Sequence, residues 1–384
     1  MKDSFVYSIQ PTILPRRGEV IFRNFIITVM PDTRHPKPNT LDIQIINPID
    51  YPDWDKLVLQ HEGTTIFHTQ AWAKTLYESY NYKPLYFTAF ENNGISALLP
   101  VMEVYSHLTG KRGVALPFTD YCEPMTNNSL DFHDIFKQII DHGKKKGWKY
   151  LELRGVQNRL YDQTPSTYFY GHTLNLSNDE NKIFFQFRNS TQRNIKKSEK
   201  EGVSVLLSHS PKSMEEFYRL NCLTRKEHGL PPQPFTFFKN IYKEIISHKA
   251  GFTVLAAFNN KTIAGAVFLH HGGKALYKYG ASDKTYQNLR ANNLIMWEAI
   301  KYYCKNGYSE FCFGRTEPEN QGLRQFKTGW GTKEHIINYY KYDLQMNAFV
   351  KDNQTIKPLY NKIFSTMPIP LLKAAGTLLY KHMG

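Results

Sequence analysis

The chain has 384 residues, more than one ordinary domain holds, so two domains are expected. Lys and Arg outnumber Asp and Glu by 48 to 34, and this net charge of +14 fits either a polyanionic partner or a generally basic surface. The four cysteines form no CxxC pair and no apolar run reaches about 18 residues, so we expect a cytoplasmic protein with reduced thiols, no metal site and no membrane-spanning helix.

Residues 1–40 are rich in proline and have no regular hydrophobic period, which predicts a disordered N-terminal tail. Their most apolar stretch, residues 20–30, is short and is interrupted by Arg23, so it makes a poor signal peptide. Met1 and Met30 are both candidate start residues.

Two β-hairpins are predicted further along the chain. PLYFTAF (84–90) and GISALLPVMEV (94–104) flank the turn sequence ENNG, and TIAGAVFLH (262–270) and ALYKYGAS (275–282) flank a Gly-Gly turn. Each hairpin is followed by a predicted helix, near 132–146 in the first case and 289–306 in the second. A strand follows each helix, so both halves of the chain are expected to run strand, strand, helix, strand.

The helix-and-strand part of this pattern repeats at a fixed offset of 160 residues. In both copies a helix ends at a glycine and leads through an aromatic residue into an alternating strand. The six matched pairs are Ile140 and Ile300, Lys145 and Lys305, Gly147 and Gly307, Trp148 and Tyr308, Leu151 and Phe311, and Leu153 and Phe313. We infer two α+β domains of the same kind at 41–178 and 179–345, followed by a basic tail at 346–384.

Five further motifs, taken in order, resemble the FemABX family, whose members carry two GNAT acyltransferase domains in tandem. The motifs are FHTQAWAKTL (67–76), LPFTDYCEPM (116–125), RNSTQRNIKKSEKEGVSV (188–205), TRKEHGLPPQPFTFF (224–238) and GRTEPENQGLRQFKTGWG (314–331). The resemblance implies an α/β sandwich of tandem GNAT domains. It also implies a bacterial enzyme that forms an amide on an amine of a peptidoglycan or polysaccharide precursor, which is nucleotide- or lipid-linked.

The acyl donor stays open between two chemistries. A CoA-binding GNAT domain carries a glycine-rich loop before its main helix, where backbone N–H groups and the helix N-terminus hold the pyrophosphate. Residues 287–295, QNLRANNLI, occupy that place without a glycine. The donor is therefore either aminoacyl-tRNA or acyl-CoA, and no tightly bound cofactor is expected. The acyl-CoA case would make the chain an N-acetyltransferase for polysaccharide modification.

The resemblance assigns the central chemistry to the last motif. It places Phe326 and Lys327 at the border of the acceptor pocket, with Lys327 able to stabilise the oxyanion that forms during acyl transfer. Arg315, at the start of the same motif, is a candidate substrate-binding residue. The alternative is that Lys327 is a surface lysine beside core aromatic residues.

Other candidate residues come from the earlier motifs. Asp120 follows a strand and could orient or deprotonate an amine, or simply form a turn, and Tyr121 beside it is a candidate substrate-binding residue. Gln70 and Lys74 resemble the family's N-terminal substrate motif, although the family's lysine lies slightly further on, where this chain has Leu76.

A basic cluster is predicted on one helix. Arg193 shares a helical face with Lys196, Lys197 and Lys200, and Arg188 lies just before them. Arginine suits phosphate, so Arg188 and Arg193 are candidate clamps for a nucleotide-linked substrate or tRNA. A solvated helix face is the alternative.

From Asn353 onward the chain has four lysines and no acidic residue. This segment fits peripheral contact with the inner face of the plasma membrane, or a helix packed on the second domain. A third class of function also remains open, namely a tRNA- or membrane-binding protein built on GNAT folds that have lost activity.

Overall fold

The computed structural model describes residues 41–384 except 93, 127–128, 157–158 and 352–357. The predicted tail at 1–40 lies outside these residues. Within the described part of the chain, no helix has the length and apolar character needed to cross a bilayer, and no group of three or more potential ligands could hold a metal ion. All four cysteines are free and buried.

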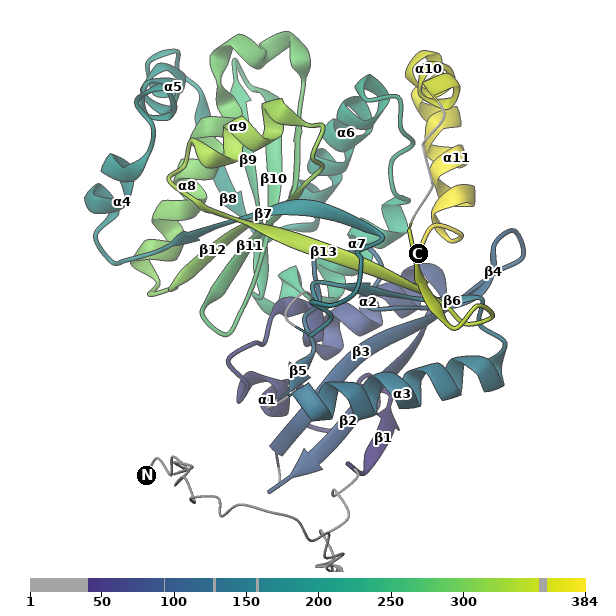
Figure 1. Cartoon of the computed structure of the whole chain (residues 1–384). Helices are drawn as coiled ribbons and strands as arrows, with labels where there is room; N and C mark the ends of the chain where they lie inside the picture. The colour runs from purple at the N-terminus through teal and green to yellow at the C-terminus, as the bar shows by residue number, and fades with distance from the viewer. Residues whose placement is uncertain (1–40, 93, 127–128, 157–158, 352–357) are drawn as a thin grey trace, which may run out of the picture. The chain divides into compact units, whose positions relative to one another are not determined.

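One mixed sheet of 14 strands organises residues 41–384 (Figure 1). Twelve strands follow each other across it, while β14 (Ala348–Val350) pairs with β13 and β5 (Met125–Thr126) pairs with β3. The order of the twelve is β1 (Ile43–Ile46), β2 (Lys83–Glu91), β3 (Gly94–Ser106), β4 (Gly110–Val114), β6 (Tyr150–Arg154), β13 (Lys333–Asp343), β7 (Thr167–Asn175), β12 (Glu310–Thr316), β11 (Lys274–Ser282), β10 (Lys261–His271), β9 (Gly251–Phe258) and β8 (Ser204–Ser208).

The helices repeat as the strands do. A pair of helices follows the first strand of each half, and one long helix precedes the last parallel strand. The helices are α1 (Trp54–Leu59), α2 (Gln70–Tyr80), α3 (Ser129–Lys146), α4 (Glu180–Gln186), α5 (Asn189–Lys200), α6 (Pro211–Glu227), α7 (Phe235–Glu244), α8 (Ala291–Lys305), α9 (Gln321–Thr328), α10 (Pro358–Thr366) and α11 (Ile369–Tyr380).

Each half contains more strands than the sequence pattern predicts. The helices α3 and α8 and the strands β6 and β12 correspond as expected, and β6 lies parallel to β4 as β12 lies parallel to β11. The predicted hairpins both exist, as β2–β3 and β10–β11. They are not equivalent, however, because β10–β11 takes the place of β3–β4 in the repeat, and β2 corresponds to β9. The short strand β4 was not predicted.

The two halves exchange a strand at the centre of the sheet. β7 leaves the first half and pairs with β12, while β13 leaves the second half and pairs with β6. β7 and β13 then pair with each other, antiparallel, which closes the sheet between the halves. The boundary predicted at 178/179 therefore separates the halves in sequence but not in the sheet, and it stays a prediction about independent domains.

Successive side chains along each strand point to opposite faces of the sheet and pack into separate cores there. On one face α3 covers the first half and α8 covers the second, each over its own core. On the other face α1, α2, α6 and α7 share a single core, where Trp72 of α2 meets Phe237 of α7 edge to face with ring centroids 6.2 Å apart. This shared core joins the two halves.

The C-terminal helix packs against the fold, as one of the two interpretations of the tail predicted. Leu372, Gly376 and Tyr380 of α11 are buried at intervals of four residues, and α11 lies against α6. A Cβ at Gly376 would lie 2.0 Å from the Pro232 carbonyl oxygen, so this close approach requires glycine. Arg112 of β4 donates to the carbonyl of Gly384 at 2.6 Å, which fixes the end of the chain.

Candidate active site

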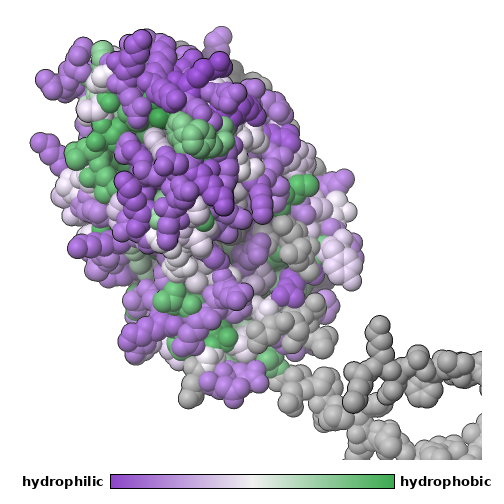
Figure 2. Space-filling view, turned by 90° about the vertical axis from the view of Figure 1, so that its left-hand side faces the viewer, coloured by the Kyte–Doolittle hydropathy of each residue, from purple (hydrophilic) through white to green (hydrophobic). Residues whose placement is uncertain are grey.

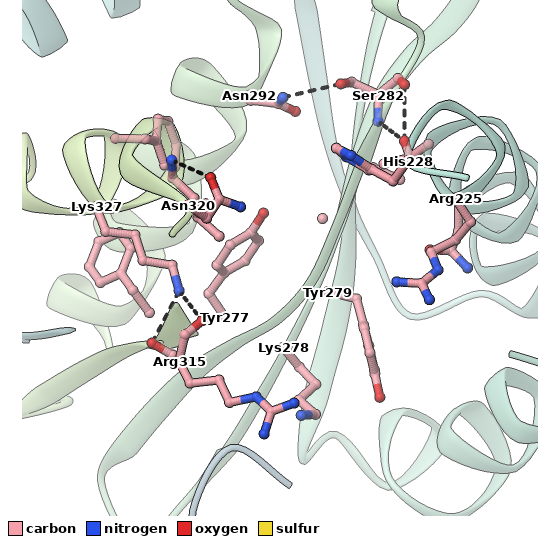
Figure 3. Close-up of a pocket in the computed structure, with 18 of the residues that line it drawn as sticks. Arg225, His228, Tyr277, Lys278, Tyr279, Ser282, Asn292, Arg315, Asn320 and Lys327 are labelled. Atoms are coloured by element: carbon pink, nitrogen blue, oxygen red, sulfur yellow. Dashed lines mark hydrogen bonds between the residues drawn. The ribbon is translucent and has the colours of Figure 1, made fainter. Parts of the chain in front are cut away.

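A cavity of about 560 Å³ opens where two parallel strands separate. β11 and β12 are paired only over Lys274–Leu276 and Glu310–Cys312. The pairing of β10 with β11 then skips Lys278, which is the extra residue of a β-bulge. Beyond this point the two strands form the walls of the cavity, whose volume is typical of small-molecule sites (Figure 3).

Side chains from both halves of the chain reach this cavity. Asp120 comes from the loop after β4, and the second half supplies residues of α6, β11, β12 and α9. The polar and aromatic residues that line the cavity include Asp120, Arg225, His228, Tyr277, Lys278, Tyr279, Arg315, Asn320, Phe326, Lys327 and Tyr380.

An ion pair between the halves lies in the cavity wall. Lys278 Nζ is 2.8 Å from Asp120 Oδ2, and the Lys278 side chain is only 4% exposed. Its ammonium also lies over the rings of Phe67, Trp72 and Tyr279, at 5.2 to 5.9 Å from their centroids. Burial raises the pKa of Asp120, but the Lys278 charge and hydrogen bond outweigh burial, so the pKa lies below its ordinary value.

Lys327 projects from α9 into the same cavity. Asn320 caps this helix by accepting a hydrogen bond from the Leu323 N–H at 3.0 Å. The Lys327 Nζ donates to the carbonyls of Gly314 at 3.1 Å and Arg315 at 2.8 Å, and the residue is 3% exposed. Burial lowers the pKa of Lys327 to about 8, although the Asp120 carboxylate opposes this shift.

The aromatic residues next to Lys327 hold α9 in place. Trp330 is fully buried and packs on Phe187, Phe313 and Phe326, with ring centroids 4.9 to 6.2 Å apart. Phe326 in turn lines the cavity. Lys327 therefore has two aromatic neighbours because Trp330 anchors α9 and Phe326 forms part of the cavity wall.

Arg315 joins the two halves around Asp120. Its Nη1 donates to the Tyr339 hydroxyl at 2.6 Å, and that hydroxyl donates to the Asp120 carbonyl at 2.7 Å. The Arg315 backbone N–H donates to Asp120 Oδ1 at 3.3 Å. Gly314 before it has φ +68°, and a Cβ there would lie 3.2 Å from the same oxygen, so this position favours glycine.

Four of the sequence-predicted residues therefore share one cavity: Asp120, Arg315, Phe326 and Lys327. Tyr121 lies elsewhere, with Phe67 in the core between the halves. Gln70 and Lys74 line a separate cavity beside α7, where Lys74 pairs with Glu244 at 3.0 Å.

Arg193 lies on the outer face of α5 and Arg188 directly before this helix, and neither lines the cavity. The basic residues of α5 are exposed while Thr191, Ile195 and Ser198 are buried, so the predicted basic face points outward. Figure 2 shows the side of the molecule that carries α4 and α5, where hydrophilic side chains dominate. The Arg188 N–H donates to the Gly329 carbonyl at 2.9 Å, which links this helix to the end of α9.

The sequence interpretation missed Lys278, Arg225 and Tyr380. In LYKYG, Lys278 looks like a solvent-facing strand residue, because a bulge cannot be recognised from alternation alone. Arg225 lies in the motif TRKEHGLPPQPFTFF (224–238), where the sequence alone does not distinguish it from the neighbouring charged residues. Its Nη2 donates to the Tyr380 hydroxyl at 2.8 Å, so α11 forms part of the cavity wall.

The start of α8 lies at the edge of the cavity. Ser282, Gln287 and Asn292 line it there, and Asn292 Nδ2 donates to Ser282 Oγ at 3.3 Å. Arg290, the residue before α8, adopts φ 57°. The turn therefore takes a left-handed conformation without glycine and brings a large side chain to the position where a glycine-rich loop would expose its backbone.

Comparison with known proteins shows which proteins this chain resembles. The family described as "Acetyltransferase (GNAT) domain" matches residues 186–328. The lipid II:glycine glycyltransferase of Staphylococcus epidermidis is 34% identical over 76 residues, which are 18% of this chain and 18% of that protein. The enzyme of the same name from Staphylococcus saprophyticus is 32% identical over 114 residues, 28% of this chain and 25% of that protein. The matches thus span a quarter or less of these relatives' length.

A solved structure supports the fold over most of the chain. The crystal structure of FemX aligns with a TM-score of 0.62 at 13% identity, covering 84% of this chain and 100% of FemX. Since this identity is low, the alignment is evidence for the fold alone. Together with the sequence matches, it shows that the chain has an α+β fold like that of FemX, in which residues 186–328 match the acetyltransferase (GNAT) domain.

Proposed function

We propose that this chain is an aminoacyl transferase that forms an amide on an amine of a lipid-linked peptidoglycan precursor. The observation that carries the proposal is Lys327, a buried ammonium that lines a cavity of suitable size beside the Asp120–Lys278 pair. The short sequence matches to lipid II:glycine glycyltransferases support this choice of acceptor.

The reaction needs little beyond positioning and charge. The acceptor amine attacks the ester carbonyl carbon of aminoacyl-tRNA, so a C–N bond forms and negative charge gathers on the carbonyl oxygen. When the intermediate collapses, the ester C–O bond breaks, and the proton lost by the amine is matched by one gained by the leaving ribose oxygen. Lys327 can serve as donor to the oxyanion, because a lysine with a pKa of about 8 is mainly an ammonium at neutral pH.

Asp120 is better suited to orient the acceptor amine than to remove a proton from it. Its lowered pKa makes it a weak proton acceptor, and both carboxylate oxygens already accept hydrogen bonds, from Lys278 and from the Arg315 N–H. We propose that Asp120 positions the amine and holds Lys278 and Arg315 in place. Arg225 and His228, across the cavity, would contact the remainder of the acceptor.

A tRNA donor is favoured over acyl-CoA by two features. The turn before α8 carries Arg290 where a CoA-binding loop has glycine, and the exposed basic face of α5 lies next to the helix that carries Lys327. Arg188 and Arg193 would contact tRNA phosphates there. The specific observation that keeps acyl-CoA as the second candidate is that the cavity reaches the N-terminus of α8, which still favours an anion.

A transfer assay with both donors separates these possibilities. Purified protein is given a lipid-linked precursor with either charged tRNA or acyl-CoA, and the product mass is measured. We expect an added amino acid with charged tRNA only. Transfer from acyl-CoA would favour the second candidate, and no transfer from either donor would favour a binding protein without activity. A lipid-linked acceptor further requires contact with the inner membrane face, for which the C-terminal helices offer a surface.

A further inference from the structure

The C-terminal helix α11 carries a second apolar face that the fold does not cover. At about 100° per residue, Leu379 adjoins the buried stripe, and Leu371 and Leu378 lie further round the helix on the same side, so the apolar arc is more than twice as wide as the stripe that packs on α6. All three leucines are exposed, Leu371 to 60%. α11 therefore presents hydrophobic surface to solvent that its packing does not explain.

Exposed apolar residues also lie on segments near α11. Ile363 of α10 and Met383 after α11 are exposed, and so is Leu108, at 71%, in the turn between β3 and β4. That turn lies against the end of α11, because Ser106 Oγ is 2.9 Å from His382 Nδ1. Figure 1 shows α10 and α11, in yellow, beside the β4 turn at the same edge of the molecule. We define the apolar face as Leu108, Ile363, Leu371, Leu378, Leu379 and Met383.

The charge around this face indicates what kind of partner binds there. From Asn353 to Gly384 there is no Asp or Glu, and the exposed Lys362 and Lys381 lie on α10 and at the end of α11, while the Lys373 ammonium lies 5.3 Å from the ring centroid of Tyr218 on α6. Leucine side chains bordered by lysines fit a bilayer surface with anionic headgroups, where the leucines enter the acyl boundary and the lysines meet the phosphates. A protein partner would not require the absence of acidic residues.

We propose that the apolar face and its lysines dock the protein peripherally on an anionic bilayer. This deepens the proposed function, since α11 ends at Tyr380, which lines the candidate active site and hydrogen-bonds Arg225. Docking would place the cavity close to the bilayer surface, where the headgroup of a lipid-linked acceptor lies. Removal of the whole tail would be a poor test, because Leu372, Gly376, Tyr380 and Gly384 are buried in the fold.

The test uses the full chain and vesicles of phosphatidylcholine with or without phosphatidylglycerol. Co-sedimentation should show binding to the anionic vesicles only, weakened by salt. Leu371→Glu/Leu378→Glu should weaken that binding by more than roughly tenfold, and Lys362→Gln/Lys381→Gln by roughly fivefold per lysine. Leu206→Glu is the matched control, because Leu206 is 61% exposed but lies on β8, at one edge strand of the sheet.

The melting temperatures of all variants should stay close to that of the parent, and Leu371→Glu/Leu378→Glu should still act on a water-soluble analogue of the acceptor. The docking proposal fails if the parent ignores anionic vesicles, if the double-leucine variant binds as well as the parent, or if Leu206→Glu loses as much. It also fails if the double-leucine change abolishes self-association and not vesicle binding. Vesicle binding without transfer from any donor would instead remove the proposed function and leave docking standing.

Discussion

The two halves of the molecule have the same order of elements but use the gap between their parallel strands differently. In the second half β11 and β12 separate and leave the candidate active site. In the first half β4 and β6 are paired only over two residues, and the segment after β4, residues 115–122, fills the gap. The second half thus holds a cavity, while the first half closes its own gap and contributes Asp120 to that cavity.

We call residues 115–122 the plug. They fill the gap in the first half and also supply Asp120 to the cavity of the second half. Leu116 is fully buried and its carbonyl accepts a hydrogen bond from Arg154 Nη1 at 3.1 Å. Leu116 and Phe118 adopt φ of 55° and 62°, conformations that cost about 1–3 kcal/mol each and persist only where neighbours enforce them. The same segment then presents Asp120 to Lys278 of the second half. The strained backbone of one half therefore positions a charged group in the site of the other.

The largest effect is expected from separating that charge pair. Lys278→Met leaves the Asp120 carboxylate buried without its partner, which should lower the free energy of unfolding by about 3–5 kcal/mol. Urea denaturation measures this. Asp120→Asn/Lys278→Met should recover most of the loss. Lys56→Met is the control, because Lys56 and Asp53 form an exposed pair 2.6 Å apart that should contribute less than about 1 kcal/mol. Equal losses of unfolding free energy in Lys278→Met and Lys56→Met would mean that the two halves do not depend on the Asp120–Lys278 pair.

Removing the Lys327 charge should act on the reaction and not on the fold. Lys327→Met keeps the chain length, so α9 should stay in place, while turnover should fall about 100- to 1,000-fold, or about 2.7–4 kcal/mol. Steady-state kinetics should show little change in the Michaelis constant. A variant that turns over normally would make Lys327 a structural residue, and one that loses only affinity would make it a binding residue; either result would leave the cavity without its oxyanion donor.

Loosening the plug should have a moderate effect. Arg154→Met removes the hydrogen bond to Leu116 and the 2.6 Å ion pair with Glu152, which should cost about 1–3 kcal/mol of stability. Turnover should also fall, because Asp120 follows the plug. Arg219→Met, at an exposed ion pair, is the comparison. If Arg154→Met unfolds at the parental urea concentration, the plug is not held as described.

The smallest effect is expected on the exposed face of α5. Arg193→Ala should raise the Michaelis constant for the donor by roughly two- to fivefold at low salt and less at high salt. Its melting temperature should match the parent, because Arg193 is exposed. A large loss of stability with unchanged donor affinity would show that the arginine is structural.

The sequence predicted the parts of the fold that depend on local pattern. α3–β6 and α8–β12 were recognised because a glycine-ended helix and an alternating strand leave a clear period. β4 was missed because GKRGV contains two glycines and two basic residues and looks like a turn. The exchange of β7 and β13 was also missed, since alternation shows that a segment is a strand but not which strand it pairs with.

For the site, the family resemblance brought forward Asp120, Arg315, Phe326 and Lys327, and the structure places all four around one cavity. Their catalytic roles stay predictions. Lys278 could not be found, because only the bulge in β11 and the plug from the other half make its position special. The position of Lys278 in the site depends on contacts between segments far apart in the sequence, which a local sequence pattern does not predict.

The role of Lys327 as a buried ammonium can be tested by a pH–rate profile under single-turnover conditions, with the intact donor measured at each pH. Since the pKa of Lys327 is lowered to about 8, the charged form is present below that pH and is lost above it. We expect the rate to fall above pH about 8 in the parent. In Lys327→Arg, whose guanidinium stays protonated, the remaining rate should show no such fall. A fall in rate of the same size and at the same pH in both proteins would assign the fall to another group and would show that Lys327 does not act as a buried ammonium in the reaction.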